Sequence, residues 1–111
     1  MNEAERLMND YLIWKTDNIN KKVGFFPVYS NFKEHMRELS PGAISLYLYF
    51  GIHSKNKTGE SYHSIETIAD FFGKSSRTIS SWIKELEENQ LIVRRQNKIR
   101  GVSTTYLRPY R

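Results

Sequence analysis

Apolar and polar positions alternate along this chain in the blocks expected of a mainly helical protein. In residues 3–16 (EAERLMNDYLIWKT) apolar side chains recur at helical spacing, at Leu7, Met8, Tyr11, Leu12 and Trp14. This pattern predicts an amphipathic helix, which the polar stretch 18–24 should end. Residues 25–32 (FFPVYSNF) are aromatic and β-prone, but Pro27 restricts them to an edge strand or an extended connection.

The middle of the chain predicts a core helix. Ser40-Pro41 is typical of a helix start, because serine caps free amides and proline suits the first helical position. Residues 43–52 (AISLYLYFGI) are apolar almost all round, as in a central helix. Residues 53–60 should form a loop that turns at Thr58-Gly59, and residues 61–63 a short strand.

Two more helices follow, separated by a sharp turn. Ser64 should open the first, and Gly73 should end it. Either Ser75 or Ser76 should cap the second, which Asn89-Gln90 should end. The apolar positions of the second helix fit the i, i+3, i+4, i+7 pattern at Ile79, Trp82, Ile83 and Leu86. Trp82 is therefore expected in the core and not on a base-stacking surface.

The C-terminal part predicts a β-hairpin. Residues 91–96 (LIVRRQ) and 102–110 (VSTTYLRPY) are β-prone, and NKIRG between them is a turn that carries Lys98 and Arg100. Charge is distributed unevenly along the chain: the net charge is +5, yet residues 1–90 sum to −1. The last 21 residues contain no acid and six bases, Arg94, Arg95, Lys98, Arg100, Arg108 and Arg111. This polarity favours a polyanionic partner over a merely solvated tail.

Composition narrows the class of protein. Hydrophobic content is 39% and charged content 26%, values of an ordinary globular domain. The absence of cysteine excludes disulfides, thiol nucleophiles and thiolate zinc sites. No apolar run approaches the roughly 20 residues that span a bilayer, and the acidic N-terminus is unlike a signal peptide. We therefore expect a soluble, cytoplasmic protein without a membrane partner.

The segment 64–92 (SIETIADFFGKSSRTISSWIKELEENQLI) resembles the winged helix-turn-helix domains of bacterial plasmid and phage replication proteins and of many transcriptional regulators. Residues 39–50 (LSPGAISLYLYF) are similar to the first helix of that group. The resemblance implies an α+β, mainly helical fold: a three-helix core, a C-terminal β-hairpin wing and an N-terminal helical extension. The expected domains are the extension, residues 1–38, and the winged helix, residues 39–111.

In such a fold the second helix of the motif, here residues 76–89, enters the major groove of DNA. Helical spacing places Arg77, Ser81 and Lys84 opposite the apolar stripe. Arginine can bond guanine through two donors, while short hydroxyl side chains allow close approach to bases or phosphates. The expected DNA-binding residues of this recognition helix are Ser75, Ser76, Arg77, Thr78, Ser80, Ser81 and Lys84.

The wing, residues 91–110, is expected on the backbone or in a minor groove. Its expected contacts are Arg94, Arg95, Lys98, Arg100 and Thr104, and Lys74 and Ser64 should contact the backbone elsewhere. Tyr106 and Tyr110 stand among these basic residues, as ordinary strand residues or as phosphate contacts.

Nothing in the pattern favours an enzyme. His35, His53 and His63 are far apart in the sequence, without a metal-ligand spacing, and the glycines form no phosphate loop. We expect no catalytic site, metal, cofactor or small-molecule substrate. The expected function is sequence-preferring binding of double-stranded DNA, in transcription regulation or in plasmid or phage replication or transfer. The alternative is a winged-helix interaction module whose basic wing meets an acidic partner.

The N-terminal helix has two interpretations. It could pack on its own domain as an extra core element, or it could pair with a second copy to form a homodimer. A dimer would place two recognition helices about one DNA turn apart on a palindromic site.

Overall fold

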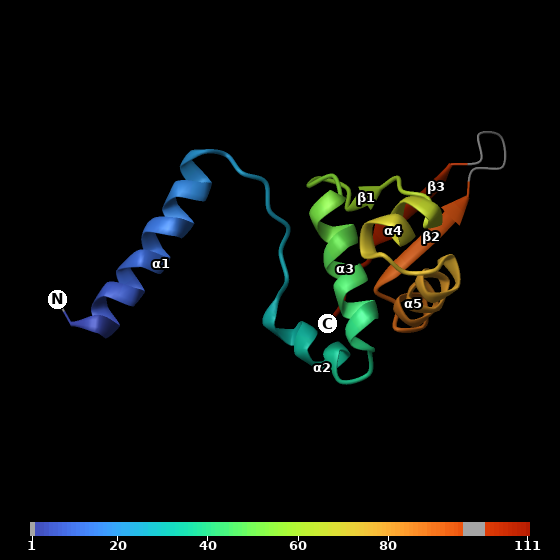
Figure 1. The fold of residues 1–111 in the computed structure, drawn as a ribbon, viewed down its shortest axis with the longest axis horizontal. Coiled ribbons are helices and arrows are strands. Elements are labelled where there is room, and N and C mark those ends of the chain that lie inside the picture. Colours follow the sequence, from blue (N-terminus) through green and yellow to red (C-terminus); the bar gives the residue numbers. More distant parts are fainter. Residues whose placement is uncertain (1, 97–101) are drawn as a thin grey trace.

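The computed structural model describes residues 2–96 and 102–111. Helices dominate (Figure 1), and the elements in chain order are α1 (Glu3–Asn20), the 3₁₀ turn η1 (Ser30–Phe32), α2 (Lys33–Met36), α3 (Pro41–His53), β1 (Glu60–Ser61), α4 (Ile65–Phe72), α5 (Ser76–Glu88), β2 (Ile92–Gln96) and β3 (Ser103–Leu107). The expected hairpin tip, with Lys98 and Arg100, lies outside the described residues.

The three strands form one antiparallel sheet in the order β1-β3-β2. β2 and β3 pair in the expected hairpin, with Ile92 opposite Leu107 and Arg95 opposite Thr104. β1 begins one residue earlier than the sequence suggested and pairs with the far edge of β3. Gly59, whose φ is +71°, turns the chain into β1 in a conformation that glycine adopts without strain.

The core lies between α3, α4, α5 and the sheet. Leu46 and Phe50 of α3 are fully buried, together with Ile68 of α4 and Ile79 and Leu86 of α5. α3 is not buried on every side, however. Leu48 and Ile52, one turn apart, are 40% and 70% exposed, so part of the apolar surface of this helix remains open to solvent.

Serine caps start all three core helices, as the sequence predicted. The hydroxyl oxygens of Ser40, Ser64 and Ser75 accept hydrogen bonds from the backbone amides three residues onward, at 3.1–3.2 Å. Each bond satisfies one of the amides that a helix start leaves free. Ser75 and not Ser76 is therefore the cap of α5.

Two of the helix ends use the same backbone geometry. Gly73 ends α4 in the left-handed conformation, and the amide of Lys74 donates to the carbonyl of Ala69 at 3.0 Å. Gln90 takes that conformation after α5, with φ +59°, and the amide of Leu91 donates to the carbonyl of Leu86 at 3.0 Å. The turn between α4 and α5 is thus fixed by one glycine.

Residues 26–39 pack on the domain, although the sequence assigned residues 1–38 to the extension. Phe32 is buried and stacks on Tyr47 with ring centroids 4.7 Å apart, and the Tyr29 amide donates to the Tyr110 hydroxyl at 2.8 Å. The segment is extended at first, but η1 and α2 make it helical from Ser30 to Met36. Elements this short depend on tertiary packing and leave no periodic pattern.

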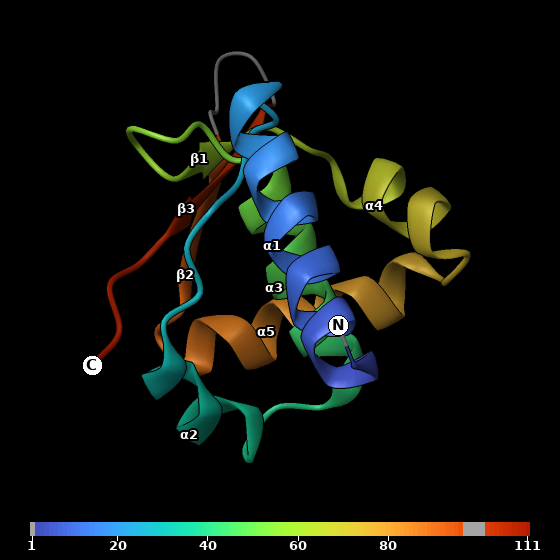
Figure 2. The same ribbon diagram turned by 90° about the vertical axis from the view of Figure 1, so that its left-hand side faces the viewer.

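α1 is longer than expected and stands apart from the body (Figures 1 and 2). It continues through the predicted break at Asn18, whose side-chain amide donates to the carbonyl of Trp14 at 2.9 Å. All of its side chains are exposed except that of Asn18, which is half-buried. In the described chain, no helix combines the length and the apolar character needed to cross a membrane.

Candidate nucleic-acid interface

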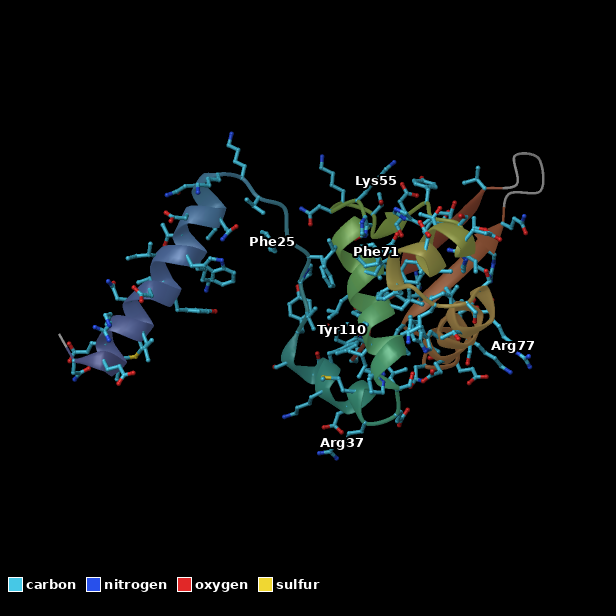
Figure 3. All side chains as sticks on the ribbon, viewed as in Figure 1. Phe25, Arg37, Lys55, Phe71, Arg77 and Tyr110 are labelled. Carbon is cyan, nitrogen blue, oxygen red and sulfur yellow. The ribbon has the colours of Figure 1, made fainter. Side chains whose placement is uncertain are left out.

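α5 carries an exposed polar face opposite its buried stripe. Ile79, Ile83 and Leu86 are buried against the core. The exposed residues on the other side, which we call the recognition face, are Ser76, Arg77, Ser80, Ser81 and Lys84. Figure 3 shows the Arg77 side chain extending from α5 into solvent. Helical periodicity thus brings Arg77, Ser80, Ser81 and Lys84 to one surface, and Ser76 is exposed beside them because it is the first residue of α5.

The other two predicted residues bond to each other. The Ser75 hydroxyl lies 3.0 Å from the Thr78 hydroxyl and caps the Thr78 amide at 3.2 Å. Ser64 and Thr67 repeat this arrangement at the start of α4, with hydroxyls 2.9 Å apart. Because their hydroxyls already have partners in the protein, Ser64, Ser75 and Thr78 position the helix starts first and offer only their remaining bonding capacity to a ligand.

Lys74 is exposed at the turn before α5. Beside it is a shallow, open hollow lined by Glu66, Ala69, Asp70, Gly73, Lys74, Ser75 and Ser76. The free amides of a helix start attract a phosphate, and the ammonium of Lys74 adds to that attraction. The carboxylates of Glu66 and Asp70 oppose it, so a backbone phosphate would bind best on the Lys74 side of the hollow.

The acidic residues of α5 have separate roles. Glu85 is turned toward α3, where its carboxylate accepts bonds from the amide and the hydroxyl of Ser40 at 2.8 and 2.7 Å. This contact ties the last turn of α5 to the start of α3. Glu88 lies 4.0 Å from the ammonium of Lys84, but both side chains are more than 60% exposed. An exposed pair of this kind is weak, so Lys84 can exchange Glu88 for a phosphate.

Trp82 packs against the domain, as expected, although it is only half-buried. Its indole fills the space over Gly42, where a Cβ would lie 2.1 Å from the ring, and it meets the Phe72 ring edge-on with centroids 5.6 Å apart. The Trp82 side chain thus fixes the position of α5 against both α3 and α4.

Two arginines of β2 that were predicted to contact DNA lie in different surroundings. Arg95 is exposed, with the half-buried Thr104 opposite it. The guanidinium of Arg94 instead donates to the Thr105 hydroxyl at 2.6 Å and to the His63 carbonyl at 2.7 Å. The expectation that Arg94 reaches outward to DNA therefore does not fit this geometry. Neighbouring strand residues face opposite sides of a sheet, and Arg94 lies on the inner one.

Burial lowers the pKa of Arg94, while the nearby carboxylates of Glu87 and Glu66 raise it. Its guanidinium remains charged, as arginine does in proteins. Arg94 thus holds β2 and β3 to the segment that leads into α4. Sequence spacing did not show this role, because the Thr105 and His63 partners are 11 and 31 residues away.

Two of the three histidines meet, which their separation in the sequence did not indicate. The rings of His53 and His63 have centroids 4.8 Å apart, and both contact the Tyr49 ring. Burial lowers the pKa of His63, and the neighbouring His53 and Arg94 lower it further. Within residues 2–96 and 102–111, no three His, Cys, Asp or Glu side chains gather as a metal site would require. His35 packs beside Phe32 and Tyr110.

The two tyrosines near the basic residues also differ. Tyr110 packs its ring edge-on against Phe32, with centroids 5.4 Å apart, and its hydroxyl oxygen accepts a hydrogen bond from the Tyr29 amide. Tyr106 of β3 is 37% exposed. These contacts of Tyr110, which is labelled in Figure 3, hold the C-terminal segment on the domain, and of these two tyrosines Tyr106 is the more accessible to a ligand.

Comparisons with known proteins agree with this architecture. A protein family described as "Helix-turn-helix domain" matches residues 37–92. Among solved structures, the chain is similar to a MarR-like transcriptional regulator from Thermotoga maritima, with a TM-score of 0.54 and 15% sequence identity. The alignment covers 97% of this chain and 66% of the regulator, so the chain spans just under two-thirds of that protein's length. No curated protein matches the chain. The likeness confirms the predicted winged-helix fold.

Proposed function

Since this chain belongs to the helix-turn-helix domain family, we propose that it binds double-stranded DNA with sequence preference. In this proposal α5 lies in the major groove, and β2 and β3 lie along the backbone or a minor groove. The process we favour is transcription regulation, because the similar solved structure is of a protein described as a transcriptional regulator. Replication or transfer of a plasmid or phage is the alternative process.

The observation that carries the proposal is the composition of the recognition face. It presents one guanidinium, one ammonium and three small hydroxyl groups, and its acidic neighbours Glu87 and Glu88 lie at the far end of α5. Small side chains let a helix approach base edges closely, and a guanidinium offers two parallel donors to guanine. A face that binds another protein more often presents large apolar anchors.

The exposed side chains divide into two proposed roles. Arg77, in the first turn of α5, is placed to contact base edges, because the N-terminal part of a recognition helix meets the bases. Lys74, Lys84 and Arg95 are proposed to contact phosphates. Each phosphate neutralised steepens the salt dependence of binding by about 0.9 in log–log slope. Arg94 has no direct contact in this proposal and instead positions the wing.

Selection from a random duplex library, read by sequencing, tests the proposal. We expect enrichment of a defined motif, because α5 offers donors suited to particular base edges. Failure to enrich any motif would instead favour the interaction module, in which the basic wing meets an acidic partner.

We also propose that the boundary of the extension lies near Phe25, because residues from Phe26 onward pack on the domain. In this division α1 and its connection form the extension. α1 stands on the opposite side of α3 from α5 (Figure 1), so it would leave the recognition face free. We propose that it mediates self-association of two copies.

A further inference from the structure

α1 offers a broad apolar surface without a partner among the described residues. The side chains at helical spacing on this surface, the α1 apolar face, are Leu7, Met8, Tyr11, Leu12, Trp14 and Ile19. They are between 57% and 65% exposed. Surface helices of folded proteins normally bury such a stripe, and their stability comes mostly from that packing. α1 therefore needs a surface on which to dock.

The domain carries a second open apolar surface. Leu48 and Ile52 of α3, and Phe71 of α4, are 40%, 70% and 67% exposed, and we call them the α3–α4 band. The Phe71 ring lies against the Tyr49 ring, with centroids 5.0 Å apart, which places Phe71 beside α3 (Figure 3). Adjacent exposed apolar residues of this size are typical of interaction sites.

Local bonds hold α1 away from its own α3. The amides of Lys22 and Val23 donate to the carbonyls of Ile19 and Asn18 at 3.1 and 3.0 Å, so the helix ends in a closed cap. Phe26 is fixed on the domain, because its ring fills the space where a Gly51 Cβ would lie, 2.2 Å away. Only Gly24 and Phe25 separate these two fixed points, and α1 projects outward from them (Figures 1 and 2).

Charge distinguishes two ways in which a second copy could cover α1. α1 contains four acidic and two basic side chains, a net charge of −2. α3, which provides Leu48 and Ile52 of the band, contains no Asp, Glu, Lys or Arg. Pairing two α1 helices would bring together two helices of net charge −2, whereas docking α1 along α3 places it against an uncharged helix.

We propose that two copies exchange their N-terminal helices, so that the α1 apolar face of each packs on the α3–α4 band of the other. This inference deepens the proposed self-association and does not depend on DNA binding. The two surfaces of one copy together offer on the order of 800–900 Å², close to the roughly 800 Å² per partner of a stable interface. The contact is isologous, as the common two-fold dimers are.

The test is sedimentation equilibrium of the full chain without DNA. We expect a dimer for the wild type, and at least a tenfold weaker dimer for Tyr11→Glu on α1 and for Ile52→Glu on the band. Two matched controls place the same charge elsewhere. Ile13→Glu lies on the opposite side of α1, and Met36→Glu lies on α2; both residues are about half exposed, and both variants should dimerise like the wild type.

Mixing the variants identifies the exchange. Tyr11→Glu retains an intact band, and Ile52→Glu retains an intact α1, so an equimolar mixture should contain more dimer than either variant alone. Circular dichroism checks that each variant is folded, and Phe71→Glu is a second band variant. A monomeric wild type would overturn the proposal. So would a dimer that survives Ile52→Glu and Phe71→Glu, because it would indicate pairing of α1 with α1. DNA affinity, measured separately, is not decided by either result.

Discussion

Arg94 and Arg95 of β2 are neighbours with opposite surroundings. The guanidinium of Arg94 bonds to Thr105 and to the His63 carbonyl, whereas Arg95 is exposed. Two adjacent arginines in a strand look alike in a sequence, because the alternation alone does not say which face meets the core. Ile92, on the side of Arg94, is buried, but Leu91 and Val93, on the side of Arg95, are apolar too, so the sequence did not show that Arg94 points inward.

At Gly42, the absence of a side chain makes room for Trp82. We expect Gly42→Ala to destabilise the domain by about 1–3 kcal/mol, because a Cβ there would overlap the indole ring and force it to move. Urea unfolding followed by tryptophan fluorescence measures the change. Gly24→Ala is the matched control, since a Cβ at that position would have no described atom within 4 Å beyond its chain neighbours. Equal stabilities for the two variants would contradict the packing of Trp82 on α3.

His63 should make folding depend on pH. Its pKa is lowered in the folded protein by burial and by the neighbouring His53 and Arg94. Protonation of His63 therefore favours the unfolded state. The resulting loss of folding stability is absent above the ordinary histidine pKa of about 6.5 and grows as the pH falls below it.

We expect His63→Phe, which retains an aromatic ring against Tyr49, to lose less stability than the wild type between about pH 6.5 and 5. Urea unfolding at a series of pH values measures the difference. Parallel pH profiles for the two proteins would show that His63 is not involved.

At the scale of the elements, the helix starts could be predicted and the short connecting helices could not. Ser40, Ser64 and Ser75 cap their helices because a hydroxyl oxygen supplies an acceptor for free amides, and this chemistry is local. η1 and α2 depend instead on the packing of Phe32 against Tyr47 and Tyr110, which are distant in the sequence. The pattern of residues 25–32 alone could not show those contacts.

A glycine at the end of α5 should stabilise the folded protein. Gln90 adopts a left-handed backbone, with φ +59°, that glycine takes without steric cost. We expect Gln90→Gly to raise the free energy of unfolding by about 0.5–1 kcal/mol. Thermal unfolding measures it. Asn89→Gly is the control: Asn89 has φ −85°, and its side-chain amide bonds to the Glu85 carbonyl, so glycine there should lower stability. A destabilised Gln90→Gly would contradict this account of the helix end.

At the scale of the whole molecule, the chain separates two surfaces. α5 and the strands β2 and β3 lie on one side of α3, and α1 lies on the other (Figure 1). The sequence predicted which side chains of α5 are exposed, because one helical period fixes which of them oppose Ile79, Ile83 and Leu86. It left the placement of α1 open, since amphipathic spacing indicates that a helix has an apolar face and not which surface covers that face.

The central claim is that the recognition face reads DNA, and its most direct test is a binding titration on a duplex enriched from the random library. We expect Arg77→Ala to bind that duplex about 5- to 150-fold more weakly and to discriminate less against a single base change, as the loss of a bidentate contact worth about 1–3 kcal/mol implies. Arg37→Ala removes the same charge from an exposed side chain that points away from α5 (Figure 3), and it should bind like the wild type. Equal affinity and equal discrimination for Arg77→Ala and the wild type would contradict the account.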